Sequence, residues 1–228
     1  MSYSSKFAFL LIILIIVSCN KEKNNDDSIV NIVAVMKSKK GKSIDLRNAL
    51  LSLVKPTRKE EGFISYDVHE SKDSTLFLYE KWRSQEDLNL HLKKPYIKDF
   101  VRKLDTLLQG KNDAHFGKLI SNPNTNRKIE DLSKAVFIAS IKKPKAGMRS
   151  ALRESLLALV EPTHSEDGCI TYDIYEEKDG SIFLYEVWSS QEDLNKHFEK
   201  TYVKAFRSKA KDLAEVNIVH FGKRISDN

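Results

Sequence analysis

Two histidines stand at equivalent places in two predicted helices and could do acid–base chemistry. His91 lies three residues after Leu88, and His197 lies three residues after Leu194. Residues three apart share one face of a helix, so both imidazoles are expected to point inward with the leucines. Imidazole changes its protonation near neutral pH, which suits a general base. The spacing equally allows a buried histidine that is hydrogen-bonded to a backbone carbonyl.

An aromatic and an acidic side chain accompany each histidine on a predicted strand. Trp82 and Trp188 each follow a glutamate, Glu80 or Glu186, by two residues, so each pair shares one face of its strand. An unpaired inward carboxylate is costly. Each glutamate should therefore pair with a cation or a histidine, or hydrogen-bond a ligand. Each tryptophan either stacks on an aromatic ligand or packs at the end of its strand.

Two tyrosines and two further histidines also occupy equivalent places. Tyr66 and Tyr172 lie on the preceding predicted strand, where they line either the core or a pocket, and the core is the simpler interpretation. His115 and His220 stand beside a Phe-Gly pair on the last predicted strand of each half. We interpret this second pair of histidines as structural.

The sequence lacks the signatures of several other chemistries. It has no CxxC motif and no pair of histidines four residues apart, so no metal site is predicted. A glycine-rich phosphate loop and a Ser/His/Asp signature are also absent. The 38 Lys and Arg and 32 Asp and Glu give a formal net charge of +6, and the densest basic run, residues 37–42, has no aromatic residue within it. We therefore predict no cofactor and no nucleic-acid partner.

The chain repeats itself with an offset of 106 residues. Residues 62–67 (Gly-Phe-Ile-Ser-Tyr-Asp) return as 168–173 (Gly-Cys-Ile-Thr-Tyr-Asp), and residues 84–89 return unchanged as 190–195. A His-Phe-Gly sequence recurs at an offset of 105. Such a repeat indicates two copies of one folding unit. We expect module 1 at residues 29–120, a polar linker at 121–133 and module 2 at 134–226.

The hydrophobic pattern of module 1 predicts four strands, three helices and the fold class. Strands are predicted at 30–36, 63–71, 76–83 and 114–120, and helices at 42–58 and 96–108. A short helix is also predicted to begin after Ser84, which acts as its N-cap with Asp87 three residues on. The order of strand, helix, strand, strand, helix and strand is that of a ferredoxin-like α+β module. One sheet face of such a module is bare. We therefore predict that the two tandem ferredoxin-like modules form an intramolecular dimeric α+β barrel.

The N-terminus predicts export and a lipid anchor. Lys6 precedes an apolar run at 7–17 that is too short to cross a membrane, and Ile16-Val17-Ser18-Cys19 resembles the lipobox of bacterial lipoproteins. We expect a signal peptide at 1–18, lipidation of Cys19, a polar tether at 19–28, and a location outside the cytoplasm, on the periplasmic side or the cell surface. An ordinary secretory signal is the alternative. Cys169 stands alone in the modules, as a small buried hydrophobe or a reduced thiol.

The two modules carry the same set of motif residues. In module 1 they are Gly41, Pro56-Thr57-Arg58, Glu61-Gly62-Phe63, Tyr66-Asp67, Leu78-Tyr79-Glu80-x-Trp82, Ser84, Leu88 and His91. In module 2 they are Gly147, Pro162, Glu166, Gly168, Tyr172, Glu186, Trp188 and His197. This set resembles the antibiotic biosynthesis monooxygenase domain over about 90 residues of each module.

The resemblance implies a cofactor-independent monooxygenase that oxidises a quinol-like or polycyclic aromatic substrate with O₂ in a pocket between sheet and helices. It implies His91 and His197 as the acid/base residues; the substrate-binding residues would be Trp82, Trp188, Glu80, Glu186, Tyr66, Tyr172 and Arg58. A base would deprotonate a phenol, and the electron-rich anion would pass an electron to O₂ without a metal.

Two departures and one alternative accompany the resemblance. Tyr96 and Tyr202 stand where many members have a second histidine, and Arg58 is replaced by His164 in module 2, which implies different substrates for the two sites. Haem-degrading relatives bind iron through a histidine on the later helix, which has none here. The alternative is a non-catalytic lipoprotein that binds a small hydrophobic ligand or a protein partner. The sequence leaves further oligomerisation open.

Overall fold

The computed structural model describes residues 29–111, 113–122 and 131–227. The predicted signal peptide, Cys19, the tether and most of the linker lie outside these residues. Within the described ranges, no helix has the length and apolar character needed to cross a membrane.

Module 1 has the predicted order of elements. These are β1 (Val30–Met36), α2 (Ser43–Thr57), β2 (Phe63–Ser71), β3 (Leu76–Trp82), α3 (Gln85–Leu92), α4 (Pro95–Leu107) and β4 (Asp113–Leu119). The predicted N-cap of α3 is confirmed, because Ser84 Oγ accepts a hydrogen bond of 3.1 Å from the backbone N–H of Asp87. Pro56 lies near the end of α2, where few further backbone bonds are lost.

Module 2 repeats this order with one difference. Its elements are β5 (Val136–Pro144), α5 (Arg149–Leu157), α6 (Val160–His164), β6 (Cys169–Glu176), β7 (Ile182–Trp188), α7 (Gln191–Glu199), α8 (Thr201–Leu213) and β8 (Ala214–Arg224). The helix that corresponds to α2 is divided into α5 and α6. The backbone N–H of Leu159 bonds to the carbonyl of Leu156, a tighter i→i−3 step that interrupts the α-helix. Cys169 is fully buried in the core of this module, as the hydrophobe interpretation predicts.

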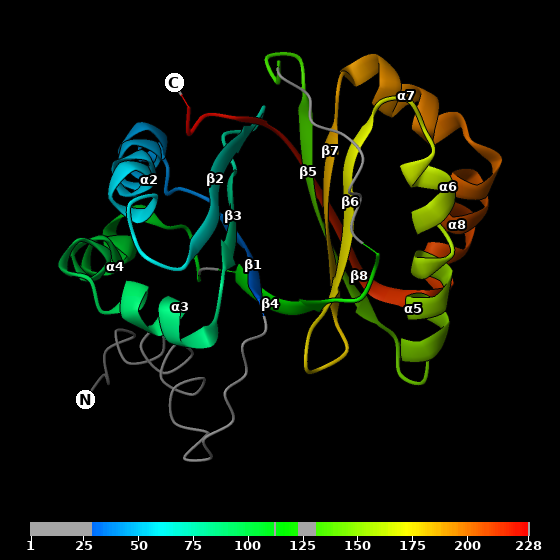
Figure 1. The fold of residues 1–228 in the computed structure, drawn as a ribbon, viewed down its shortest axis with the longest axis horizontal. Helices are drawn as coiled ribbons and strands as arrows, with labels where there is room; N and C mark the ends of the chain where they lie inside the picture. The colour runs from blue at the N-terminus through cyan, green and yellow to red at the C-terminus, as the bar shows by residue number, and fades with distance from the viewer. Residues whose placement is uncertain (1–28, 112, 123–130, 228) are drawn as a thin grey trace.

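The eight strands close into one antiparallel barrel in the order β1-β3-β2-β8-β5-β7-β6-β4. Figure 1 shows the helices of the two modules on the two outer sides and the strands between them. The modules are joined where β8 pairs with β2 through Gly222–Arg224 and where β4 pairs with β6 through Lys118 and Leu119. The predicted intramolecular α+β barrel is therefore confirmed.

Three apolar layers hold the barrel together. Module 1 buries leucines such as Leu46 and Leu50 of α2 against its sheet, and module 2 does the same with Leu152 and Leu156 of α5. The third layer fills the space between the two sheets, and its members include Val33, Phe77, Tyr79, Phe137, Phe183 and Tyr185. The layer between the sheets explains why one module needs the other, because each bare sheet face is covered only in the closed barrel.

Polar groups are paired within this inter-sheet layer. The rings of Tyr79 and Tyr185 stack across it with centroids 3.8 Å apart, and the hydroxyl groups of Tyr79 and Tyr175 are 2.7 Å apart. His69, which sequence reasoning did not single out, is fully buried there with Nε2 3.1 Å from the Tyr185 hydroxyl. Burial lowers the pKa of His69 to about 3, so this imidazole is neutral in the folded protein.

Candidate functional site

The tryptophan and glutamate predicted to share a strand face are joined in both modules. The indole Nε1–H of Trp82 donates to Glu80 Oε2 at 3.0 Å, and Trp188 donates to Glu186 at 3.1 Å. Both indoles are fully buried. The strand alternation thus places each indole and its acceptor in the layer between sheet and helices.

Each helix histidine lies against the tryptophan of its own module. The ring centroids of His91 and Trp82 are 4.5 Å apart, and those of His197 and Trp188 are 4.4 Å apart. The tyrosine of the preceding strand completes the aromatic surroundings, with Tyr66 6.0 Å from the His91 ring. The structure therefore brings together the histidine, tryptophan, glutamate and tyrosine that the sequence suggested.

A second carboxylate, which sequence reasoning missed, holds each histidine. Glu60 Oε1 lies 2.7 Å from His91 Nδ1, and Glu166 Oε1 lies 2.6 Å from His197 Nδ1. A carboxylate can only accept, so Nδ1 carries the proton and Nε2 is the basic nitrogen. Nε2 of either histidine makes no hydrogen bond with a described residue. This is the arrangement in which a carboxylate fixes the tautomer of a general base.

The same carboxylate also accepts from a tyrosine on the following helix. The hydroxyl of Tyr96 makes a short hydrogen bond to Glu60 Oε1 and lies 3.3 Å from Thr57 Oγ1. In module 2, Tyr202 contacts Glu166 and Thr163 in the same way. The tyrosines noted as a departure from the family pattern therefore belong to the histidine group.

The loop that carries Glu60 is brought against α3 by a glycine. Gly62 has a φ of +82°, and a Cβ placed on it would lie 2.1 Å from Asp87 Cγ at the start of α3. Asp87 is fixed there by Arg83, with bonds of 3.0 and 2.9 Å, and by Ser84 at 2.7 Å. This close approach of the loop to α3 lets Glu60 reach His91. In module 2, a Cβ placed on Gly168 would lie 2.1 Å from Asp193 Cβ.

Burial shapes the electrostatics of the group. The pKa of Glu80 is raised by burial, against which the nearby His91 and the Trp82 hydrogen bond act. The pKa of Glu186 is raised by burial as well. Burial also raises the pKa values of Tyr66 and Tyr172 well above the ordinary value, so both are neutral phenols.

One buried cation distinguishes the two modules. Lys142 of β5 is 5% exposed and donates to Ser140 Oγ at 2.8 Å and to Asn217 Oδ1 at 2.7 Å. Its charge opposes the raised pKa of Glu186, whereas module 1 has Met36 at the equivalent position. Burial lowers the pKa of Lys142 to about 8. No pattern in the sequence marks this lysine as buried, because the preceding residue on its strand face is the polar Ser140 and it lies near the end of its strand.

Arg58 lies outside the histidine group. Its guanidinium donates to the carbonyl of Tyr66 at 3.2 Å, to Asp67 at 3.0 Å and to Asp227 at 2.8 Å. His164, its counterpart, lies 3.1 Å from the carbonyl of Tyr172 through Nε2. The two residues therefore perform a similar backbone contact in the two modules.

The alignment of the acidic motif residue needs a correction. Glu60, not Glu61, is the counterpart of Glu166, since both carboxylates bond the helix histidine. The side chain of Glu61 is 88% exposed and contacts Arg83. An exact offset of 106 already pairs Glu60 with Glu166, so strict use of the repeat could have found this residue.

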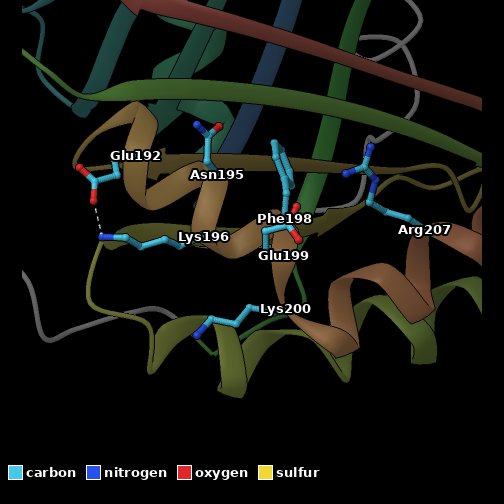
Figure 2. Close-up of a pocket in the computed structure, with 7 residues that line it drawn as sticks. All are labelled: Glu192, Asn195, Lys196, Phe198, Glu199, Lys200 and Arg207. Atoms are coloured by element: carbon cyan, nitrogen blue, oxygen red, sulfur yellow. Dashed lines mark ion pairs between the residues drawn. The ribbon is translucent and has the colours of Figure 1, made fainter.

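The histidine groups are closed. His91 and His197 are 2% and 3% exposed. Two open pockets lie on the surface of the described residues, and neither histidine lines them. Figure 2 shows one of these pockets, of about 800 Å³, on the outer side of α7. Charged side chains dominate its lining, and Lys196 forms an ion pair of 2.7 Å with Glu192. This pocket is a solvated hollow of mixed charge that does not reach Trp188.

Within the described ranges, no group of three His, Cys, Asp or Glu side chains is arranged to hold a metal ion. The groups around His91 and His197 instead combine a base, a carboxylate, a phenol and an indole. This combination can exchange a proton with a ligand and hold an aromatic ring.

Comparison with known proteins places this geometry in a family. The sequence profile described as "Antibiotic biosynthesis monooxygenase" matches residues 29–103 and again residues 135–209. A Mycobacterium tuberculosis protein named "Putative monooxygenase Rv0793" is 38% identical over 71 residues, or 31% of this chain and 70% of that protein. An uncharacterised Synechocystis protein is 29% identical over 106 residues, which cover 44% of this chain and 72% of that one.

Two solved structures share the whole double-module fold. A Fusobacterium nucleatum protein named "Putative monooxygenase" superposes with a TM-score of 0.73 at 17% identity. The superposition covers 87% of this chain and 93% of the Fusobacterium chain. An "anthrone oxidase-like protein" superposes with a TM-score of 0.68 at 11% identity and covers 88% and 92%. At these identities the likeness concerns the fold.

Proposed function

The chain belongs to the antibiotic biosynthesis monooxygenase family, and we propose that it oxidises a quinol-like or polycyclic aromatic substrate with O₂ and without a cofactor. The observation that carries the proposal is the His–carboxylate pair beside a buried tryptophan, which occurs in both modules. The same set of contacts is kept in both modules of the repeat.

His91 Nε2 would take a proton from the substrate phenol. Glu60 then faces an imidazolium, and the charge-assisted hydrogen bond at Nδ1 stabilises it. His197 and Glu166 would do the same in module 2. The indole beside each imidazole would support the aromatic ring, since offset or tilted aromatic contacts are favourable.

The reaction balances without an external reductant. A hydroquinone, C₆H₆O₂, and O₂ give a hydroxyquinone, C₆H₄O₃, and water, and the substrate supplies all four electrons. The deprotonated phenol passes one electron to O₂, the resulting pair combines at carbon, and loss of water forms the carbonyl. Removing the phenolic proton is the step that the protein accelerates.

The closed state of both sites favours a second candidate function. The indoles are fully buried and the imidazoles almost so, which means that a ligand must displace side chains to reach them. A non-catalytic lipoprotein that binds a small hydrophobic ligand or a partner on the same scaffold would have no need of an open cavity in its resting state.

Oxygen uptake decides between the two functions. The full chain would be assayed with hydroquinone, 1,4-dihydroxynaphthalene and anthrone, beside His91→Ala, His197→Ala and the double variant. If both modules act, each single change removes roughly half of the rate and the double change removes about 100-fold or more, the usual contribution of a general base. His164→Arg, which installs the module 1 residue at a backbone contact, is the matched control and keeps the wild-type rate.

Uptake that is indifferent to the double change would sink the catalytic proposal. Binding of a hydrophobic ligand with no uptake on any substrate would support the second function instead.

We also propose that Cys19 carries a lipid anchor that keeps the modules outside the cytoplasm. In a bacterial host, the full chain should incorporate radiolabelled palmitate and fractionate with membranes, whereas Cys19→Ser should do neither. Equal labelling of the two proteins would contradict the anchor.

A further inference from the structure

A second pocket, of about 530 Å³, lies where the two modules meet. The end of β2 in module 1 forms one wall of it, and β8 and α7 of module 2 form the others. Its lining includes Ser71, Phe198, Val219, His220, Phe221 and Lys223. The volume is in the range of sites for small molecules.

The internal repeat supplies a filled counterpart of this pocket. His220 corresponds to His115 at the offset of 105, and Ser71 corresponds to Glu177 at the offset of 106. In that other half, His115 Nδ1 is 2.7 Å from Glu177 Oε1, and Nε2 is 3.3 Å from Asp113 Oδ1. Glu177 thus holds the histidine by a hydrogen bond where β4 crosses to module 2, and Asp113 lies within ion-pair distance of Nε2 without a hydrogen bond to it.

Both carboxylates are missing around His220. Ser71 replaces Glu177, and Ile218 replaces Asp113. The Ser71 Oγ atom is buried without a hydrogen-bond partner, and His220 makes no hydrogen bond or ion pair with a described residue. Buried polar groups are normally satisfied, so an unpaired hydroxyl at the wall of a pocket points to a group that binds there.

We propose that this pocket binds an aromatic carboxylate, whose carboxylate group takes the position that the Glu177 side chain fills in the other half. Ser71 Oγ–H and the protonated His220 ring would donate to it. The ring would lie against Phe198 and Phe221, whose centroids are 6.3 Å apart in an edge-on arrangement. Phe221 and Val219 are 43% and 41% exposed, so an apolar ligand would cover side chains that now face water.

The charges around His220 give the proposed site a pH dependence. Burial and Lys37 lower the pKa of His220, while Asp73 and Asp113 raise it. The charged residues of the pocket wall are Glu70, Asp73, Lys72 and Lys223. In the other half, burial lowers the pKa of His115, but the neighbouring carboxylates of Asp113 and Glu177 outweigh it and raise this pKa to about 9. A bound carboxylate should therefore make His220 take up a proton, and its affinity should fall as the pH rises.

This site is distinct from the His197 group and goes beyond the proposed oxidation. Phe198 lies between the two sites, because it lines the pocket and its ring centroid is 5.7 Å from that of His197. Trp188 and His197 do not line the pocket. A ligand of the histidine groups would bind in both modules. A ligand of this pocket would bind once per chain, because His115 and Glu177 fill the equivalent place.

Calorimetric titration of the full chain with 2-naphthoate tests the proposal, with 2-naphthamide as the uncharged comparison. We expect one site per chain, at least tenfold weaker binding of the amide, and weaker binding of the acid at pH 8.5 than at pH 6.5. Ser71→Glu supplies the missing carboxylate and should reduce the affinity at least tenfold. Ser52→Glu, on the exposed side of α2, adds the same charge elsewhere and should leave binding unchanged.

Three results would overturn the proposal: no binding up to 10 mM 2-naphthoate, two equivalent sites per chain, or equal affinity in wild type and Ser71→Glu. If Ser71→Glu does not fold, the ring resonances of His220 replace it as the test. These resonances, assigned with His220→Gln, should move to the protonated position on saturation with naphthoate. Unmoved resonances under saturating ligand also refute the site.

Discussion

Gly62→Ala should destabilise the protein far more than Gly41→Ala, although both glycines have left-handed backbone. Gly62 has a φ of +82° and Gly41 a φ of +77°, so a side chain costs about 1 kcal/mol of backbone strain at either position. Around Gly41, nothing lies within 4 Å of an added Cβ. At Gly62, the new Cβ would lie 2.1 Å from Asp87 Cγ and 2.5 Å from Asp87 Cβ.

The overlap at Gly62 cannot be relieved by rotating one side chain. Asp87 is bonded to Arg83 and to Ser84, and its backbone N–H is capped by Ser84 Oγ. The start of α3 must therefore move, and such overpacking costs about 2 kcal/mol more. For a chain of this size, a difference of 2 kcal/mol corresponds to about 4–8 °C in Tm.

Thermal unfolding followed by circular dichroism, with urea titration at 25 °C, measures both changes. We expect Gly41→Ala to lose about 1 kcal/mol and Gly62→Ala about 3 kcal/mol of unfolding free energy. Equal losses for the two variants would refute the reasoning that Gly62 is required by the approach of the Glu60 loop to α3.

Three further predictions concern charges. The double change Glu60→Gln and Glu166→Gln should lower the oxidation rate by about 10- to 100-fold, because each imidazolium loses a charged partner worth about 1.5–3 kcal/mol; Glu61→Gln, an adjacent exposed carboxylate, is the control for oxygen-uptake assays. His69 has a folded pKa of about 3, below that of the unfolded chain, so protons bind the unfolded state first and stability is lost as the pH falls below 6.5. Between pH 7 and 5 the loss of unfolding free energy due to His69 is about 2 kcal/mol, and urea titrations of His69→Gln should lack it. The same dependence of unfolding free energy on pH in both proteins would contradict this prediction. Lys142 has a folded pKa of about 8, also below its unfolded value, so Lys142→Met should stabilise the protein at pH 7 by up to about 3 kcal/mol and by less than about 1 kcal/mol at pH 10. A gain that does not shrink with rising pH would count against a charged Lys142.

The local patterns predicted the elements well because they rest on short-range rules. Alternation put Glu80 and Trp82 on one strand face, and Ser84 with Asp87 fixed the start of α3. The closed barrel followed from the repeat, since an uncovered sheet face needs a second sheet. The interruption between α5 and α6 was not predicted, because a single i→i−3 step at Leu159 leaves no signature in the composition.

The candidate site was predicted only in part. His91 and His197 were found from their place beside leucines, but their partners Glu60 and Glu166 lie 31 residues earlier in the chain, in a loop with no periodicity. Arg58 was assigned to the site from the resemblance, yet its hydrogen bonds go to the backbone of β2 and to the C-terminal segment. The contacts of a loop depend on what the helices place beside it.

The sequence by itself determined the duplication, the strand and helix order, and the residue types that each module contributes. These depend on spacing along the chain, which folding does not change. Only the tertiary structure decided which carboxylate holds each helix histidine and that Lys142 of module 2 is buried. It also decided that His115 forms ion pairs with carboxylates while His220 forms none with a described residue. Such pairings depend on distances between residues far apart in sequence, and these are fixed only when the two sheets close into one barrel.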